Sequence, residues 1–341
     1  MKRLFSLIFS IVVIAVLIYI LTNINFYEVY LLIKIANPIY LLLAILTMFL
    51  SFIIWNLRTW YIFRPLIKGN FWFFLNVLFA GTFFNTITPG AGIGGEPFRA
   101  HYLAKKYKKP RTRVFSYVVG DTFFRLIVNA FFIIASVFFV LLFVRISTTL
   151  KLVLELVLVV VLGAVALSLF LVLKKSHFRL GHLFKKLHPL WFIKRRFKSE
   201  KDFSNFLNTK FKGFLIALRK IVKKKDNLFI GFTLSFVFWI LHYFIAYFLF
   251  LSFGFNANFL SIIIVVTLAE IIGSFSIVPG GMGVVESSMI LLYSAMGVPL
   301  SLAFLVSFLF RIINYFFTLL IGGWCLVKVR RVINGGKFSL F

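Results

Sequence analysis

The sequence has little of what most enzymes and disulfide-stabilised proteins depend on. It holds one cysteine, Cys325, so no disulfide framework and no thiolate metal site can be built within the chain. The Gly-rich run at 90–95 lacks the Lys-Ser/Thr of a P-loop, and serine-hydrolase motifs are absent. The five histidines show no metal-ligand spacing. We therefore expect no enzyme activity, no metal and no cofactor.

Acidic residues are also scarce. The chain has nine Asp and Glu against 38 Lys and Arg, a formal net charge of +29. Most of the basic residues lie in loops that flank apolar runs, as the positive-inside rule expects of cytoplasmic loops. This distribution explains the charge without a nucleic-acid partner, so we expect none.

The sequence is rich in long runs of apolar residues. Hydrophobic residues make up 62% of the chain, 48 residues are Phe, and the mean hydropathy is +1.02. Because about 20 apolar residues cross a bilayer as one helix, these runs predict an all-α polytopic membrane protein. We expect about eight spans, at 4–22, 39–57, 71–88, 114–145, 152–173, 228–251, 259–278 and 300–327.

Charge counting predicts the topology. The basic residues at both ends of the chain place the N- and C-termini on the cytoplasmic side of the cell membrane. A basic group at 99–113 would lie outside if 71–88 crossed completely. The segment 71–97 is therefore expected to enter the membrane and return as a re-entrant hairpin that turns at Pro89–Gly95. The same argument predicts a second hairpin over 259–296, with its turn at Ser276–Glu286.

The two hairpins suggest an inverted repeat. At an offset of 190 residues, the Pro-Gly and the Glu of the first turn align with those of the second, and the charge count gives the two halves opposite topologies. We expect a single membrane domain, 1–341, with half one at 39–145, a linking span at 152–173, half two at 228–327 and a basic tail at 328–341.

The segment 174–227 is expected to be a basic cytoplasmic linker. It holds 17 Lys and Arg against Glu200, Asp202 and Asp226. From Phe203 to Ile221, apolar residues recur at helical spacing and lysines occupy the other face. This pattern is typical of a helix that lies on the anionic headgroups of the inner leaflet, although a solvated linker helix has the same pattern.

Seven charged residues stand where ions are costly. At the bilayer centre each unpaired ion costs about 2.5–3.5 kcal/mol, so these seven are expected to be paired or to line water. One interpretation is that these residues only form structural ion pairs, which hold the helices together. Asp121 and Arg125 are four residues apart and are expected to pair, and Asp121 could meet Arg311 near a pseudo-twofold axis. The seven are Glu96, Arg99, Asp121, Arg125, Glu270, Glu286 and Arg311.

The Gly-rich turns admit two interpretations. Glu96 and Glu286 could simply cap the helices that follow, since an acid suits a helix N-terminus. Alternatively, half-helix N-termini inside the membrane bind an anionic headgroup, with Arg99 as a phosphate-pairing fork, while the Glu side chains favour an amine or a proton. On the second interpretation the substrate-binding residues are the seven charged residues and Pro89, Gly90, Gly92, Gly94, Gly95, Pro279, Gly280, Gly281 and Gly283. Trp55, Trp60 and Tyr61 are expected to be interfacial anchors.

Three motifs carry a family resemblance: "TPGAGIGGEPFRA" at 88–100, "GDTFFR" at 120–125 and "SIVPGGMGVVES" at 276–287. With them, nearly the whole chain resembles the membrane region of lysylphosphatidylglycerol synthase/flippase proteins and related flippase-like membrane proteins. The resemblance implies binding or translocation of lipid headgroups. Bifunctional members carry a soluble aminoacyl-transferring domain after the membrane part. Since none follows here, lysyl transfer is not expected.

The sequence therefore predicts a flippase-like protein for a phospholipid or a polyprenyl-phosphate lipid. Two alternatives remain open. One is a secondary transporter of ions or small solutes. The other is a non-transporting membrane partner that holds a glycosyltransferase or a lipid-modifying enzyme at the inner leaflet through 174–227.

If the hairpin tips bind the lipid, Glu286→Gln and Arg99→Ala should abolish lipid movement in proteoliposomes while the protein still folds. Wild type and variants are compared with a panel of fluorescent anionic, cationic and polyprenyl-phosphate lipids. Normal lipid movement by both folded variants contradicts the prediction.

Overall fold

The computed structural model describes residues 18–88, 94–143, 148–173, 218–219, 221–274, 276 and 278–334. Throughout these residues the regular structure is helical, as the apolar runs predict. Most of the first predicted span (4–22, of which 18–22 are described), the tip of the first hairpin and most of the basic linker at 174–227 lie outside the described residues.

The helices follow one another with short connections. In chain order they are α2 (Phe26–Ile35), α3 (Pro38–Phe63), α4 (Phe71–Ile87), α5 (Gly95–Lys106), α6 (Arg111–Phe143), α7 (Thr148–Leu173), α11 (Lys225–Ser252), α12 (Phe259–Ser274), the short η2 (Pro279–Gly281), α13 (Val284–Ala295), α14 (Leu300–Tyr315), the π-helical η3 (Phe316–Ile321) and α15 (Gly322–Ile333).

The sequence encodes several helix starts through asparagine caps. Asn25, Asn37 and Asn70 precede α2, α3 and α4, and each side-chain oxygen accepts hydrogen bonds from backbone N–H groups of the first turn. These bonds satisfy donors that a helix start otherwise leaves unpaired. Pro38 at the first position of α3 adds the fixed φ that a helix requires.

Among the described residues, four helices are long and apolar enough to cross a membrane: Pro38–Phe63, Arg111–Phe143, Lys225–Ser252 and Leu300–Ile333. Shorter apolar helices are Phe71–Ile87, Leu154–Leu167 and Phe259–Ser274. At ~1.5 Å rise per residue, α4 and α12 are about 26 and 24 Å long, less than the ~30 Å of a bilayer core. A helix that enters the membrane and turns back within it is expected to be this short. That α4 and α12 are re-entrant remains a prediction.

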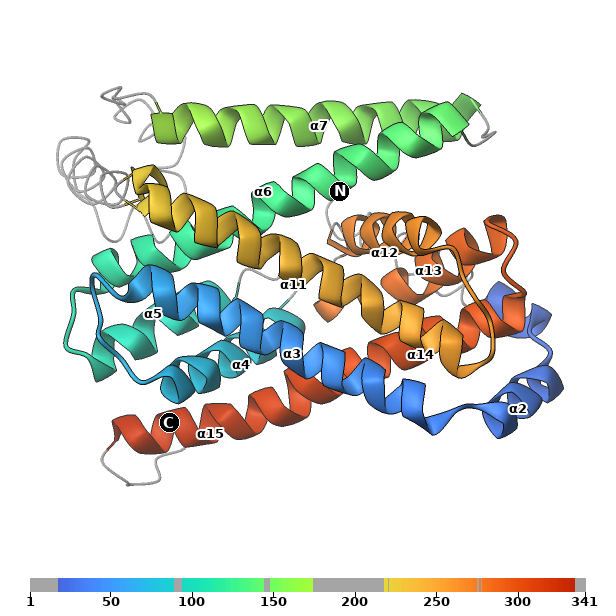
Figure 1. Ribbon diagram of the computed structural model, residues 1–341, viewed down its shortest axis with the longest axis horizontal. Helices are drawn as coiled ribbons and strands as arrows, with labels where there is room; N and C mark the ends of the chain where they lie inside the picture. The colour runs from blue at the N-terminus through green and yellow to red at the C-terminus, as the bar shows by residue number, and fades with distance from the viewer. Residues whose placement is uncertain are drawn as a thin grey trace, which may run out of the picture.

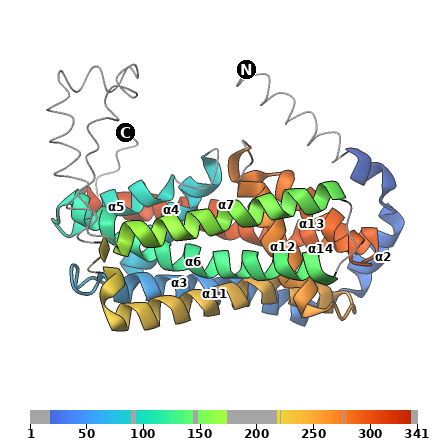
Figure 2. The ribbon, with the colours of Figure 1, turned by 90° about the horizontal axis from the view of Figure 1, so that it is seen from above.

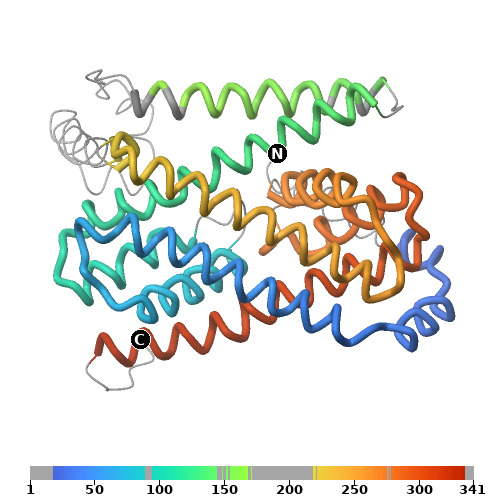
Figure 3. Tube along the Cα trace, viewed as in Figure 1, coloured from blue at the N-terminus to red at the C-terminus, as the bar shows by residue number. Residues whose placement is uncertain are grey.

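The α3 and α11 helices pack side by side through the middle of the molecule and run in opposite directions (Figure 1). The α4–α5 pair lies at one end of these two helices and the α12–α13 pair at the other, as the trace in Figure 3 also shows. The α7 helix packs along α6, and Figure 2 shows α6 between α7 and α11.

Helices of the first half have counterparts about 190 residues later. The bounds of α3, α4, α5 and α6, moved by that offset, agree within three residues with those of α11, α12, α13 and the α14–α15 run. The contacts correspond as well: α5 packs on α4 and α6, and α13 packs on α12 and α14. This is the arrangement that an inverted repeat requires. The opposite membrane topology of the two halves remains a prediction.

Glycine allows the closest helix contacts. A Cβ atom added to Gly95 of α5 would overlap the backbone oxygen of Gly81 in α4 and lie 2.7 Å from Oδ1 of Asn85. A Cβ atom on Gly322 of α15 would lie 2.7 Å from the backbone oxygen of Phe79. Small residues let membrane helices approach this closely and pack without a hydrophobic driving force.

Because backbone atoms cannot move aside easily, Gly95→Ala should destabilise the folded protein by about 1–3 kcal/mol. The matched control is Gly163→Ala in α7, where an added Cβ meets nothing within 4 Å. That change should be neutral or stabilise the helix by up to ~1 kcal/mol. Thermal unfolding in detergent measures both, and equal melting temperatures for the two variants would contradict the proposed α4–α5 contact.

Candidate functional site

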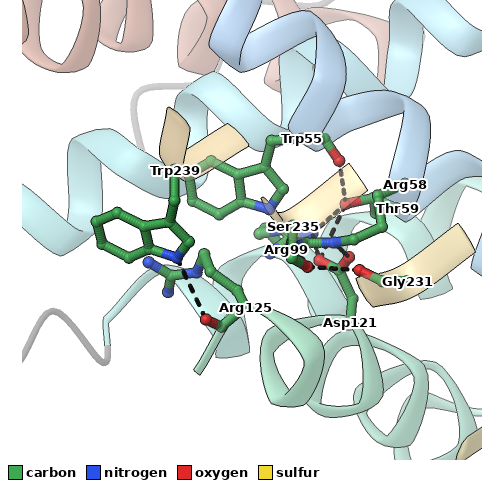
Figure 4. A network of polar contacts seen from close by, with 9 residues as sticks. All are labelled: Trp55, Arg58, Thr59, Arg99, Asp121, Arg125, Gly231, Ser235 and Trp239. Carbon is green, nitrogen blue, oxygen red and sulfur yellow. Dashed lines mark hydrogen bonds and ion pairs between the residues drawn. The ribbon is translucent and has the colours of Figure 1, made fainter. Parts of the chain in front are cut away.

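Asp121 of α6 lies at the centre of a buried polar network (Figure 4). Its Oδ1 accepts a hydrogen bond from Nε of Arg58 at 2.8 Å, and its Oδ2 accepts one from Nη2 of Arg99 at 2.9 Å. Arg58 and Asp121 are both 0% exposed. One carboxylate thus joins α3, α5 and α6, and charge-assisted bonds of this kind are among the strongest in proteins.

Two hydroxyl groups complete the network. Oγ1 of Thr59 lies 2.9 Å from Oδ2 of Asp121 and 3.1 Å from Nη2 of Arg99. Ser235 of α11 accepts a 2.7 Å bond from Nη1 of Arg58 and donates to the backbone oxygen of Gly231. The Arg58–Ser235 bond ties α11 to the network. These additional bonds are what a buried ion pair needs to offset the cost of desolvation.

The network holds more positive charge than Asp121 neutralises. Arg125, one helical turn after Asp121, lies with its Cζ 4.9 Å from the centroid of the Trp55 ring, in cation–π geometry. Within the described ranges, three buried guanidinium nitrogens have no hydrogen-bond partner: Nη2 of Arg58, Nη1 of Arg99 and Nε of Arg125. We call Arg58, Arg99 and Arg125, with Asp121, the arginine cluster.

Glu96 supplies a second negative charge close to these arginines. It lies in the first turn of α5, is 9% exposed, and exerts the largest attractive electrostatic effect on Arg125. Its buried Oε2 has no hydrogen-bond partner. Asp121 and Glu96 thus set two carboxylates against three guanidinium groups, and three of the guanidinium nitrogens bond no other described residue. An arrangement of this kind favours an anion, and a phosphate most of all, because it accepts several such bonds at once.

A second ion pair lies in the other half. Arg311 of α14 donates from Nε to Oε1 of Glu286 at 2.9 Å and from Nη2 to the backbone oxygen of Gly280 at 2.6 Å. The hydroxyl of Tyr315 bonds with both side chains. Oε2 of Glu286 is buried without a partner. Arg311 therefore holds the turn before α13 to α14.

The His242–Glu270 pair links α11 to α12. Nε2 of His242 lies 2.7 Å from Oε1 of Glu270. Glu270 is within electrostatic reach of both Arg125 and Arg311. Its charge therefore acts on one arginine of the arginine cluster and on the arginine of the second ion pair.

The predicted residues fall into these groups. Glu96, Arg99, Asp121 and Arg125 gather at the arginine cluster, Arg311 with Glu286 forms the second pair, and Glu270 lies between. The backbone takes the left-handed φ that favours glycine at three of the predicted positions, Gly280, Gly281 and Gly283. Pro279 begins the short η2 helix of that turn. Gly94 and Gly95 begin α5, and Pro89, Gly90 and Gly92 lie outside the described residues.

Two predicted pairings are wrong. Asp121 does not bond Arg125, although the spacing would allow it, because Arg58 and Arg99 from other helices occupy both carboxylate oxygens. Asp121 does not meet Arg311, which bonds Glu286 in its own half. Trp55 is not an interfacial anchor: it is buried beside the arginine cluster.

Sequence reasoning missed Arg58, Thr59, Ser235 and His242. Arg58 directly follows the predicted span 39–57, where the positive-inside rule places a basic residue at the cytoplasmic surface, but α3 continues to Phe63 and buries Arg58 inside the molecule. One signal was available: Asn56, Arg58 and Thr59 interrupt an apolar run that resumes afterwards. Ser235 and His242 carry no such signal, because single polar residues are common in apolar helices.

The sequence matches a family model across almost its whole length. Residues 5–322 match the model described as the lysylphosphatidylglycerol synthase TM region. The chain belongs to this family. The predicted resemblance is thus confirmed, and so is the prediction of an all-α, multi-pass membrane protein.

Members of this family with similar sequences occur in archaea. A UPF0104 membrane protein of Pyrococcus horikoshii is 28% identical over 309 residues, which cover 87% of this chain and 89% of that protein. One of Methanothermobacter thermautotrophicus is 28% identical over 284 residues, 82% of each chain. One of Methanocaldococcus jannaschii is 27% identical over 307 residues, 89% of this chain and 88% of that protein. These names state a membrane protein and no activity.

Because Asp121 forms ion pairs with two buried arginines, Asp121→Asn should destabilise the protein by about 3–5 kcal/mol. Thr59→Val removes one hydroxyl of the same network and should cost about 1–3 kcal/mol. Unfolding in detergent, followed by circular dichroism, measures both. A smaller loss for Asp121→Asn than for Thr59→Val would show that Asp121 is not the centre of the network.

Proposed function

We propose that this protein binds the phosphate of a membrane-lipid headgroup at the arginine cluster and carries that headgroup between the two leaflets. The observation that carries the proposal is the set of buried guanidinium nitrogens of Arg58, Arg99 and Arg125 that bond no other residue in the described part of the chain. A buried donor without an acceptor costs about 1–3 kcal/mol, and more when charged. A phosphate would satisfy these donors together.

The arrangement of the cluster suits a phosphate better than a monovalent ion. Asp121 holds two of the guanidinium groups by one nitrogen each, which leaves other nitrogens of the same planar forks available. Arginine binds phosphate through such forks, and its orientation here is fixed by helices rather than by a loop. The unpaired carboxylate oxygen of Glu96 would favour an amine or a proton beside the phosphate.

Movement between leaflets is supported by the two-part layout of the charges. Each half of the molecule contains an ionic group at the start of a short helix, α5 or α13, and Glu270 interacts electrostatically with an arginine of each group. Transporters with inverted repeats place their sites at such broken helices and expose them to one side at a time. Membership of a family described by a lipid-synthase membrane region also favours a lipid as the ligand.

The proposal includes a location and an orientation. The protein would lie in the cell membrane with both termini cytoplasmic, since basic loops favour that side. Its basic segment 174–227 would contact anionic headgroups of the inner leaflet. A lipid-modifying enzyme is a candidate partner at that surface. The protein itself would catalyse no reaction.

Arg125 gives the sharpest test because it bonds no carboxylate, so its loss should leave folding intact. Hydrogen bonds to a charged group contribute about 1.5–3 kcal/mol. Arg125→Gln should therefore slow phospholipid movement in proteoliposomes by about tenfold to a hundredfold. The control is Arg64→Gln: Arg64 is an exposed arginine stacked on Trp60 at 4.0 Å, and its variant should move lipid at the wild-type rate.

Two outcomes would contradict the proposal. If folded Arg125→Gln protein moves lipid as fast as wild type, the cluster does not bind the moving headgroup. If folded wild-type protein moves no lipid of the panel, translocation is wrong. Ion-dependent uptake of a small solute by the same liposomes, without headgroup preference, would identify a secondary transporter instead.

A further inference from the structure

A basic pocket of about 360 Å³ lies where two connections meet, the one between α3 and α4 and the one between α5 and α6. Both connections lie at the left end of the molecule in Figure 1. The charged residues that line the pocket are all basic: Arg64, Lys68 and Lys109, beside the phenol of Tyr107. Its volume is within the range of pockets that bind small molecules. A concave site lined by charge of one sign concentrates ligands of the opposite sign, so this pocket attracts anions.

The positive charge of this pocket has no acidic partner in the described part of the chain. The ion pairs found there include none of Arg64, Lys68 and Lys109. All three side chains are exposed. Cζ of Arg64 lies 4.0 Å from the centroid of the Trp60 ring, so that guanidinium is held against an aromatic face. The ammonium groups of Lys68 and Lys109 keep their N–H donors for a ligand that enters the pocket.

The walls of the pocket are held in place by hydrogen bonds. Nε1 of Trp60 donates to the backbone oxygen of Gly69 at 2.8 Å. The Tyr107 hydroxyl accepts a 3.2 Å bond from the backbone N–H of Asn70, which joins the two connections. The backbone N–H of Lys109 donates to a backbone oxygen of α5 at 3.0 Å. A ligand therefore meets a preformed site, and the cost of ordering the site on binding is small.

Hydrogen-bond donors from both connections line the pocket. They are the ammonium groups of Lys68 and Lys109 and the hydroxyl of Tyr107, whose hydrogen has no acceptor among the described residues. The neighbouring tryptophans suit a membrane surface: Trp60 is half-buried, and Trp72, at the start of α4, is 62% exposed. Such residues gather at the level of the lipid headgroups, and the basic residues of both connections favour the cytoplasmic side.

We propose that this pocket binds a phosphate group at the membrane surface, with Lys68, Lys109 and the Tyr107 hydroxyl as its ligands. A phosphate group has enough charged oxygens to accept bonds from all of these donors at once, whereas a carboxylate has fewer. Arg64, whose guanidinium is held on Trp60, adds positive potential beside them. The headgroup of an anionic phospholipid and free phosphate in the cytoplasm carry this same chemistry. The pocket shares no residue with the arginine cluster, so it would bind its phosphate whether or not that cluster moves a lipid.

The experiment measures how far a phosphate protects the lysines from acylation by an N-hydroxysuccinimide ester. Full-length protein in an uncharged maltoside detergent receives inorganic phosphate, dioleoylphosphatidylglycerol in mixed micelles, or sodium chloride of equal ionic strength. Mass spectrometry of peptides gives the acylation rate at each lysine. We expect Lys68 and Lys109 to react roughly fivefold more slowly with a phosphate-bearing probe than with chloride. Lys108, which is exposed beside the pocket but does not line it, should change by less than about twofold.

The two probes distinguish the source of the phosphate. Protection by the lipid alone identifies a headgroup site, and protection by inorganic phosphate alone identifies a site for a soluble phosphate. Either result, or protection by both probes, supports the proposal. Equal protection of Lys108 would mean a general attraction of anions to a basic surface and would overturn it. Protection by neither probe would overturn it as well.

Each lysine of the pocket also reports on the loss of the other. In Lys68→Gln, the concentration of the protecting probe that half-protects Lys109 should rise about tenfold, because one charge-assisted bond is lost. Lys108→Gln is the matched control and should leave this midpoint unchanged. Lys68 and Lys108 are both exposed, so both variants should fold, which unchanged melting temperatures check. An unshifted midpoint in folded Lys68→Gln protein would overturn the proposal.

Arg125→Gln keeps this result apart from the proposed function. Because Arg125 lies outside the pocket, its variant should retain the wild-type protection of Lys68 and Lys109. Retained protection together with slowed lipid movement supports both proposals, and retained protection with wild-type lipid movement contradicts the proposed function alone. Lost protection in this variant would mean that the lysines report on a ligand of the arginine cluster, and the pocket would not be a separate site.

Discussion

The structure depends on one carboxylate that two buried guanidinium groups share. Asp121 is surrounded by α3, α5, α6 and α11, where water does not reach, and each of its oxygens bonds a different arginine. Removing the carboxylate would leave two charges in a low-dielectric interior, so the helices that carry them must stay in register around it. The positions of Trp55, Arg125 and Ser235 follow from this packing. The arginine cluster is thus both the strongest constraint on the fold and the part with unused binding capacity.

The two halves match in backbone but not in charge. Helix bounds correspond at an offset of 190 residues, whereas the residues of the arginine cluster do not recur. In the second half, the position equivalent to Asp121 holds a basic residue, and the positions equivalent to the three arginines hold uncharged residues. The counterparts of Arg58, Arg99, Asp121 and Arg125 are Phe248, Met289, Arg311 and Tyr315. The arginine cluster therefore has no counterpart in the other half, where Arg311 instead pairs with Glu286.

Much of the fold was predictable because apolar length and helix breakers are local properties. The starts of α5 and α13 lie at the predicted Gly-rich turns, and the cost of ions in a membrane pointed to Asp121, Arg125 and Arg311 before any contact was known. The partners were not predictable. Arg58 bonds Asp121, 63 positions away, and Ser235, 177 positions away. The positive-inside rule places a basic residue that ends an apolar run at the cytoplasmic surface. Arg58 ends such a run, yet tertiary packing holds its side chain in the protein interior.

The helix Leu300–Ile333 changes its hydrogen-bonding register halfway along. The π-helical segment Phe316–Ile321 divides it, with α14 packed against α11 and α13 and α15 packed against α4 and α5. The ring of Phe317 in that segment rests on Phe52 and Phe79. Such a segment bends more readily than a regular helix. The helix Leu300–Ile333 therefore contacts both halves of the molecule. Bending of this helix would be concentrated in the six π-helical residues, which pack through Phe317 against the rings of Phe52 and Phe79.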